Sequence, residues 1–132
     1  MTFPAITALL SVFLCFFMLK MIIDIVQIRM SEKVELQTGD SDALTRAVRV
    51  HGNMVETAPL FLIMLGLLEL GGGHPIAVGI FALIFAISRV MHPIGLSGKK
   101  GTFKYRTRGM ILTLTAYILT GAYLVVVALM SF

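Results

Sequence analysis

Four long apolar stretches dominate the sequence, at residues 3–28, 47–70, 75–96 and 108–129. Each is long enough to cross a hydrocarbon core of about 30 Å. Because backbone polar groups in lipid must be satisfied within the spanning segment or a closed barrel, these stretches are predicted to be helices. The sequence therefore predicts an all-α integral membrane protein, an up-down bundle of four transmembrane helices that forms a single domain over residues 1–132.

The first stretch is predicted to be a retained helix. It has no basic residue before Lys20, and it runs well past the length of the apolar region of a cleaved signal. Cys15, the one cysteine of the chain, lies in this stretch, so no internal disulfide can form and a small apolar packing role is expected. The composition, 58% hydrophobic and 14% charged, excludes an ordinary soluble domain.

Basic residues gather in two of the three connections, and basic residues near helix ends stay on the cytoplasmic side. The connection GGGHP at residues 71–75 has none. We therefore expect both termini on the non-cytoplasmic side, in the inner membrane if the protein is bacterial. The orientation of the protein in the membrane and contact with anionic lipid headgroups explain these basic residues. We therefore expect no nucleic-acid partner. The basic residues are Arg29, Lys33, Arg46 and Arg49, then Lys99, Lys100, Lys104, Arg106 and Arg108.

The segment RAVRVHGNMVE at residues 46–56 places a polar stripe on the second helix. Arg46, Arg49, Asn53 and Glu56 fall within an arc of about 80° at helical spacing, whereas His51 points elsewhere. An unpaired carboxylate at the depth of Glu56 would cost on the order of 3 kcal/mol, so it needs a partner. The stripe is either a ligand site or a set of polar contacts between helices.

Polar residues of the other helices are expected at the same depth, because the helices alternate in direction. Lys20 and Asp24 are spaced to form an ion pair on the first helix, and Arg89 and His92 lie one turn apart on the third. Pro93 cannot donate a helical hydrogen bond, so a kink there would open a cavity at this end.

Arg108 is predicted to open the fourth helix, where its guanidinium would lie beside unsatisfied amide donors. This combination suits an anion, and especially a thiolate, because the pKa of a thiol falls next to an arginine. Lowering a thiol pKa by about two units takes roughly 2.7 kcal/mol of differential stabilisation. No metal is expected, since His51, His74 and His92 have no paired ligand spacing.

The segment RAVRVHGNMVETAPLFLIML resembles the signature of the membrane-associated proteins in eicosanoid and glutathione metabolism, the MAPEG family. The likeness extends to a turn at Gly39 and Asp40, to SRVMHPIG near the end of the third helix, and to the basic stretch before the fourth. The chain looks similar to short bacterial members and to microsomal glutathione transferase.

This resemblance implies a homotrimer with glutathione as co-substrate, bound near the cytoplasmic end between neighbouring subunits. It implies that Glu56 engages the glutathione amino group and that the arginines engage its carboxylates. It also implies that Arg108 stabilises the thiolate, with Lys104 and Arg106 as the alternatives in that stretch. The activity implied is that of a transferase or peroxidase acting on lipophilic electrophiles that arrive from the bilayer. The expected glutathione-binding residues are Arg49, Asn53, Glu56, His92, Arg46 and Arg29.

Two positions depart from the pattern of the eicosanoid enzymes. Gly52 stands where they have an arginine, and Leu96 where they have an aromatic hydroxyl. A non-catalytic protein that binds glutathione or lipid and acts on a partner is therefore the alternative. A small four-helix drug exporter is disfavoured, because such exporters have nearly balanced loop charge.

Overall fold

The computed structural model describes residues 3–97 and 101–131, and the described chain is an antiparallel bundle of four helices without strands. Helix α1 spans Ala5–Glu32 and α2 spans Asp42–Leu70. Helix α3 spans Pro75–Gly95 and α4 spans Phe103–Leu129. All four are long and apolar enough to cross a membrane, which confirms the prediction of a multi-pass membrane protein.

Three helices extend beyond the predicted spans. Helix α1 continues to Glu32, α2 begins at Asp42, and α4 begins at Phe103. The added turns are polar, so hydropathy alone could not place them. The hydroxyl of Ser41 accepts a hydrogen bond from the amide of Leu44 at 3.0 Å, which satisfies one free donor at the start of α2.

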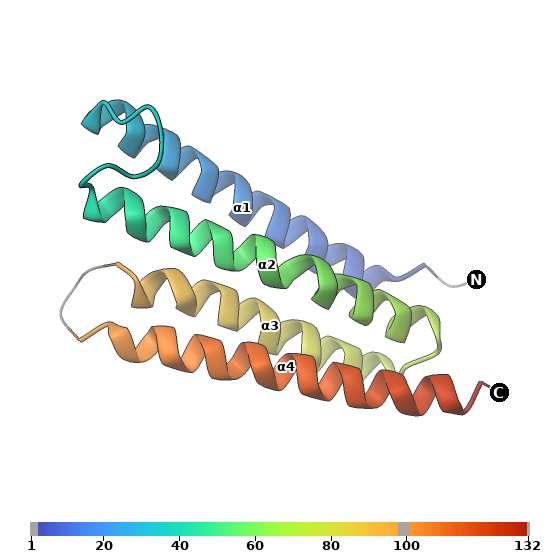
Figure 1. Ribbon diagram of the computed structural model, residues 1–132. Helices are drawn as coiled ribbons and strands as arrows, with labels where there is room; N and C mark the ends of the chain where they lie inside the picture. Colours follow the sequence, from blue (N-terminus) through green and yellow to red (C-terminus); the bar gives the residue numbers. More distant parts are fainter. Residues whose placement is uncertain (1–2, 98–100, 132) are drawn as a thin grey trace.

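The four helices do not pack equally. Helix α2 contacts each of the others, α3 and α4 form the most extensive pair, and α1 contacts only α2 and α3 within the described residues. Figure 1 shows α1 diverging from α3 and α4 toward the end where the α1–α2 connection lies. A space therefore opens between α1 and the rest of the bundle at that end.

The hydrophobic core includes residues of all four helices, and its aromatic centre lies between α2, α3 and α4. Phe61 of α2 and Phe85 of α3 stack with their ring centroids 4.0 Å apart, and the ring of Tyr117 lies 5.6 Å from that of Phe61. Both phenylalanines are fully buried. Because lipid is as apolar as these side chains, close packing rather than exclusion from water holds the helices together.

Glycine permits the close approach of α3 and α4 at the basic end. A Cβ atom added to Gly95 would overlap the backbone of Arg106, and one added to Gly109 would lie 3.1 Å from the carbonyl oxygen of Ser88. The end of α3 therefore packs directly on the first turns of α4.

Candidate functional site

Arg89 is the most deeply buried charged residue of the described chain, with only 2% of its surface exposed. Its Nη1 donates to Oδ1 of Asn53 and to Oγ1 of Thr57, both at 2.6 Å, and Nη2 donates to the hydroxyl of Thr113. Its Nε donates to Oγ of Ser88 at 3.1 Å. One guanidinium thus joins α2, α3 and α4.

This cluster contains no carboxylate. Two ion pairs occur among the described residues, Lys20 with Asp24 at 2.5 Å and Arg46 with Asp42 at 4.0 Å, and neither involves Arg89. The Arg89 guanidinium also lies 5.0 Å from the ring centre of Phe85, which adds a cation–π contact. Its positive charge is therefore hydrogen-bonded but not neutralised.

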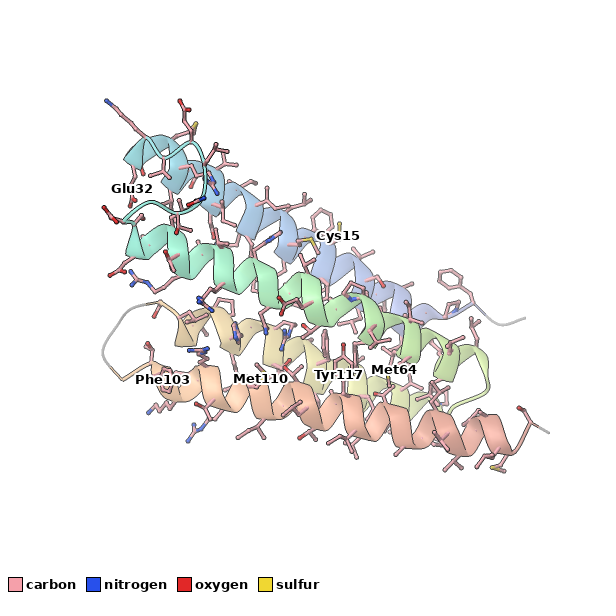
Figure 2. All side chains as sticks on the ribbon, in the orientation of Figure 1. Cys15, Glu32, Met64, Phe103, Met110 and Tyr117 are labelled. Atoms are coloured by element: carbon pink, nitrogen blue, oxygen red, sulfur yellow. The ribbon has the colours of Figure 1, made fainter. Side chains whose placement is uncertain are left out.

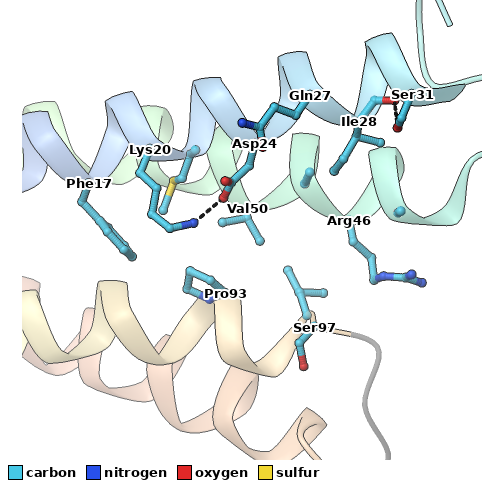
Figure 3. Close-up of a pocket in the computed structure, with 14 residues that line it drawn as sticks. Phe17, Lys20, Asp24, Gln27, Ile28, Ser31, Arg46, Val50, Pro93 and Ser97 are labelled. Atoms are coloured by element: carbon cyan, nitrogen blue, oxygen red, sulfur yellow. Dashed lines mark hydrogen bonds and ion pairs between the residues drawn. The ribbon is translucent and has the colours of Figure 1, made fainter. Parts of the chain in front are cut away.

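A groove of about 580 Å³ lies between α1 and the α2–α3 pair at the basic end. Figure 3 shows the Lys20–Asp24 ion pair on one side of it and Arg46 and Pro93 on the other. The volume is in the range of small-molecule sites, about 300–1,000 Å³. The prediction that Lys20 and Asp24 pair is confirmed.

The groove borders the Arg89 cluster. Met21, Val50 and Pro93 line both the groove and a gap beside it that has no room for a water molecule. Asn53, Arg89 and His92 line the same gap, so they pack behind the groove wall and do not open into a cavity. Polar side chains of α2 and α3 therefore lie directly behind the groove that α1 helps to form.

The predicted site residues separate into three groups. Arg46 lines the groove, and Asn53 and His92 pack in the closed gap behind it. Arg49, Glu56 and Arg108 are exposed on the outside of the single chain. Arg29 lies in the last turn of α1, where Nη1 donates to backbone carbonyls of the following connection at 3.4 Å.

The prediction that Arg108 opens helix α4 is wrong. The helix begins at Phe103, which is labelled in Figure 2, so Arg108 is its sixth residue and the free amide donors of the first turn precede it. The short basic run before it is helical, because α4 extends past the apolar span. Any anion held by Arg108 is held by its side chain, without the helix terminus.

Sequence reasoning placed Arg89 at the correct end but did not assign it to the site. It also missed Thr57 and Thr113, whose hydroxyls accept from Arg89. Tyr117 was missed as well, and its hydroxyl donates to the backbone carbonyl of Thr57 at 2.5 Å. The available signal was an arginine within an apolar span, which requires partners on neighbouring helices.

Gly52 faces open space. A Cβ atom built there meets nothing within 4 Å, so the missing side chain is not replaced by another group of the described chain.

Comparison with known proteins agrees with this architecture. The chain is 30% identical over 114 residues to the inner membrane protein YecN of Escherichia coli strain K12, a match that covers 86% of each protein. The same identity and coverage hold for YecN of Escherichia coli O6:H1. The model of the MAPEG family matches residues 7–128. The protein, a multi-pass membrane protein with four spanning helices, therefore belongs to the MAPEG family.

Proposed function

We propose that the protein is a glutathione-dependent membrane transferase or peroxidase. The observation that carries the proposal is the groove at the basic end of a membrane-spanning bundle, which Lys20, Asp24 and Arg46 line and behind which Asn53 and His92 pack, in a chain that belongs to the MAPEG family. Two carboxylates and two amides make glutathione a suitable ligand for guanidinium and carboxamide donors. Its entry from the cytoplasm fits the basic connections at this end.

A second copy of the chain would complete the site. Glu56 is exposed and has no ion-pair partner among the described residues, and it lies about 21 Å along α2 from the end of the helix at Leu70. That depth is within the hydrocarbon region, where an isolated charge is costly. In a homotrimer, glutathione and a neighbouring subunit would neutralise Glu56 and cover Arg49. The amino group of glutathione is the proposed partner of Glu56.

The proposed chemistry is thiolate activation. Arg108 is exposed on the outside of α4 and does not line the groove, so a neighbouring copy would bring it to the ligand. There it would hold the glutathione sulfur as a thiolate while the thiol proton passes to solvent. In conjugation, the sulfur electron pair forms a bond to an electrophilic carbon of a lipophile, and the leaving group departs with its bonding pair. In peroxidase turnover, the thiolate attacks the terminal peroxide oxygen, the O–O bond breaks, and the alkoxide takes a proton and leaves as an alcohol. The resulting glutathione sulfenic acid reacts with a second glutathione to give the disulfide and water. Positioning and electrostatic stabilisation would supply the catalysis.

A non-catalytic role is the second candidate, and one observation favours it. The open space at Gly52 leaves a position of the helix-two motif without a side chain that could contact glutathione. A protein that binds glutathione or a membrane lipid without activating the thiol, and that acts on a partner protein, is consistent with this feature.

We also propose the orientation of the protein. Both basic connections would face the cytoplasm and both termini would lie on the opposite side, in an inner membrane like that of the relative from Escherichia coli.

Turnover of a generic lipophilic electrophile by the purified protein with glutathione tests the catalytic proposal. We expect conjugation by the wild type, and a loss of at least tenfold in Arg108→Ala with glutathione binding retained. Arg106→Ala tests the neighbouring candidate, because Arg106 is also exposed on α4, and turnover lost in this variant but kept in Arg108→Ala would move the role to Arg106. Equal turnover by wild type and Arg108→Ala would overturn the assigned role. Binding without turnover by the wild type would favour the non-catalytic candidate.

A further inference from the structure

The orientation of the Asn53 carboxamide is determined by Arg89. A guanidinium carries only donors, so the Asn53 atom 2.6 Å from Nη1 must be the oxygen. The two ends of an asparagine amide are otherwise hard to distinguish, and here the hydrogen-bond partner assigns them.

Thr57 holds the same arrangement in place. Its hydroxyl accepts from Nη1 of Arg89 and donates to the backbone carbonyl of Asn53, both at 2.6 Å. Arg89 is in turn held by Ser88 and Thr113, whose hydroxyls accept from Nε and Nη2. The donor that fixes Asn53 is therefore itself fixed from three sides.

The amide nitrogen of Asn53 has no acceptor among the described residues. Its oxygen is occupied by Arg89, whereas Nδ2 keeps two protons to donate. Asn53 is half-buried and lines a gap behind the groove that is too narrow for a water molecule, so a ligand can reach the residue only from its exposed part. A donor held in one orientation, next to an uncompensated positive charge, is suited to an acceptor oxygen with partial or full negative charge.

We propose that Arg89 is a positioning residue that fixes Asn53 as a hydrogen-bond donor to a carbonyl or carboxylate oxygen of the bound ligand. This inference rests on the proposed function, in which glutathione supplies such oxygens. Arg89 acts through Asn53 and does not itself touch the ligand. Its guanidinium donates instead to side chains of α2, α3 and α4.

Three variants test this inference by calorimetry with glutathione and by thermal unfolding of the purified protein. Asn53→Asp keeps a partner for Arg89 but cannot donate, so the Kd should rise at least tenfold while the melting temperature does not fall. Arg89→Met removes the fixed orientation, and the Kd should rise about threefold. Thr120→Val is the control, because Thr120 is buried in α4 and its hydroxyl has no partner among the described residues, so its Kd should not change.

Melting temperatures test the contact between Arg89 and residue 53 independently of glutathione binding. In the double variant with both Asn53→Asp and Arg89→Met, the new carboxylate loses its cation, so this protein should unfold at a lower temperature than either single variant. Unchanged glutathione affinity in Asn53→Asp or in Arg89→Met would overturn the inference and leave the proposed function intact. No glutathione binding by the wild type would overturn the proposed function and the ligand role of Asn53. The melting temperatures would then still decide whether Arg89 and residue 53 are paired.

Discussion

The carboxylate of Glu69, at the end of α2, accepts hydrogen bonds from the beginning of α1. Oε2 of Glu69 lies 2.8 Å from the backbone nitrogen of Thr7 and 2.7 Å from its hydroxyl. Oε1 lies 2.9 Å from the backbone nitrogen of Ile6. A negative charge thus satisfies free amide donors at a helix N-terminus, where the helix dipole favours it. This contact joins two helices at the end opposite the groove.

Replacing Glu69 should destabilise the bundle. We expect Glu69→Ala to lower the free energy of unfolding by about 2 kcal/mol, because two amides of α1 lose charge-assisted hydrogen bonds. Glu69→Gln keeps an acceptor oxygen and should lose less. Thermal unfolding in detergent measures both. Glu35→Gln is the control, because that exposed side chain makes no hydrogen bond or ion pair among the described residues. Equal melting temperatures for Glu69→Ala and the wild type would show that the contact adds no stability.

Two glycines of α3 should respond in opposite ways to alanine. Gly95→Ala should cost on the order of 2 kcal/mol, because the added methyl group overlaps the backbone of Arg106 and forces α3 and α4 apart. Gly79→Ala meets nothing within 4 Å and should be neutral or stabilising by up to about 1 kcal/mol, because alanine favours helix. Thermal unfolding of the two variants measures this difference. Equal melting temperatures for Gly95→Ala and Gly79→Ala would contradict the close packing of α3 on α4 at Gly95.

The proposed assembly predicts a mass of three copies in detergent. Glu56 and Arg49 are exposed on the described chain, and a neighbouring copy would cover them. Light scattering of the purified protein, corrected for bound detergent, measures the number of copies. A single-copy particle that still binds glutathione would contradict the subunit-interface site, and would leave the groove between α1 and the α2–α3 pair as the place of binding.

The fold was predictable from the sequence because four apolar stretches of sufficient length permit little besides four helices. The polar ends of the helices could not be predicted, because hydropathy does not distinguish a helical turn in the headgroup region from a loop. The start of α2 at Asp42 and of α4 at Phe103 are examples. Because α4 begins at Phe103, Arg108 lies within the helix and not at its first residue.

The candidate site was predictable at the level of one helix. Helical spacing placed Asn53 on the same stripe as Arg49 and Glu56. It could not show that Asn53 lies at the edge of the stripe that meets α3, whereas Glu56 faces outward. That division depends on how α2 is rotated in the bundle, which the packing of Phe61 against Phe85 determines.

The most direct test of the central claim is the ultraviolet absorbance of the glutathione thiolate as a function of pH, with purified wild type and Arg108→Ala. The account predicts that bound glutathione ionises at a lower pH with wild type than in buffer, by about two units, and that the shift is lost in Arg108→Ala. A titration that matches free glutathione in the presence of saturated wild-type protein would contradict it.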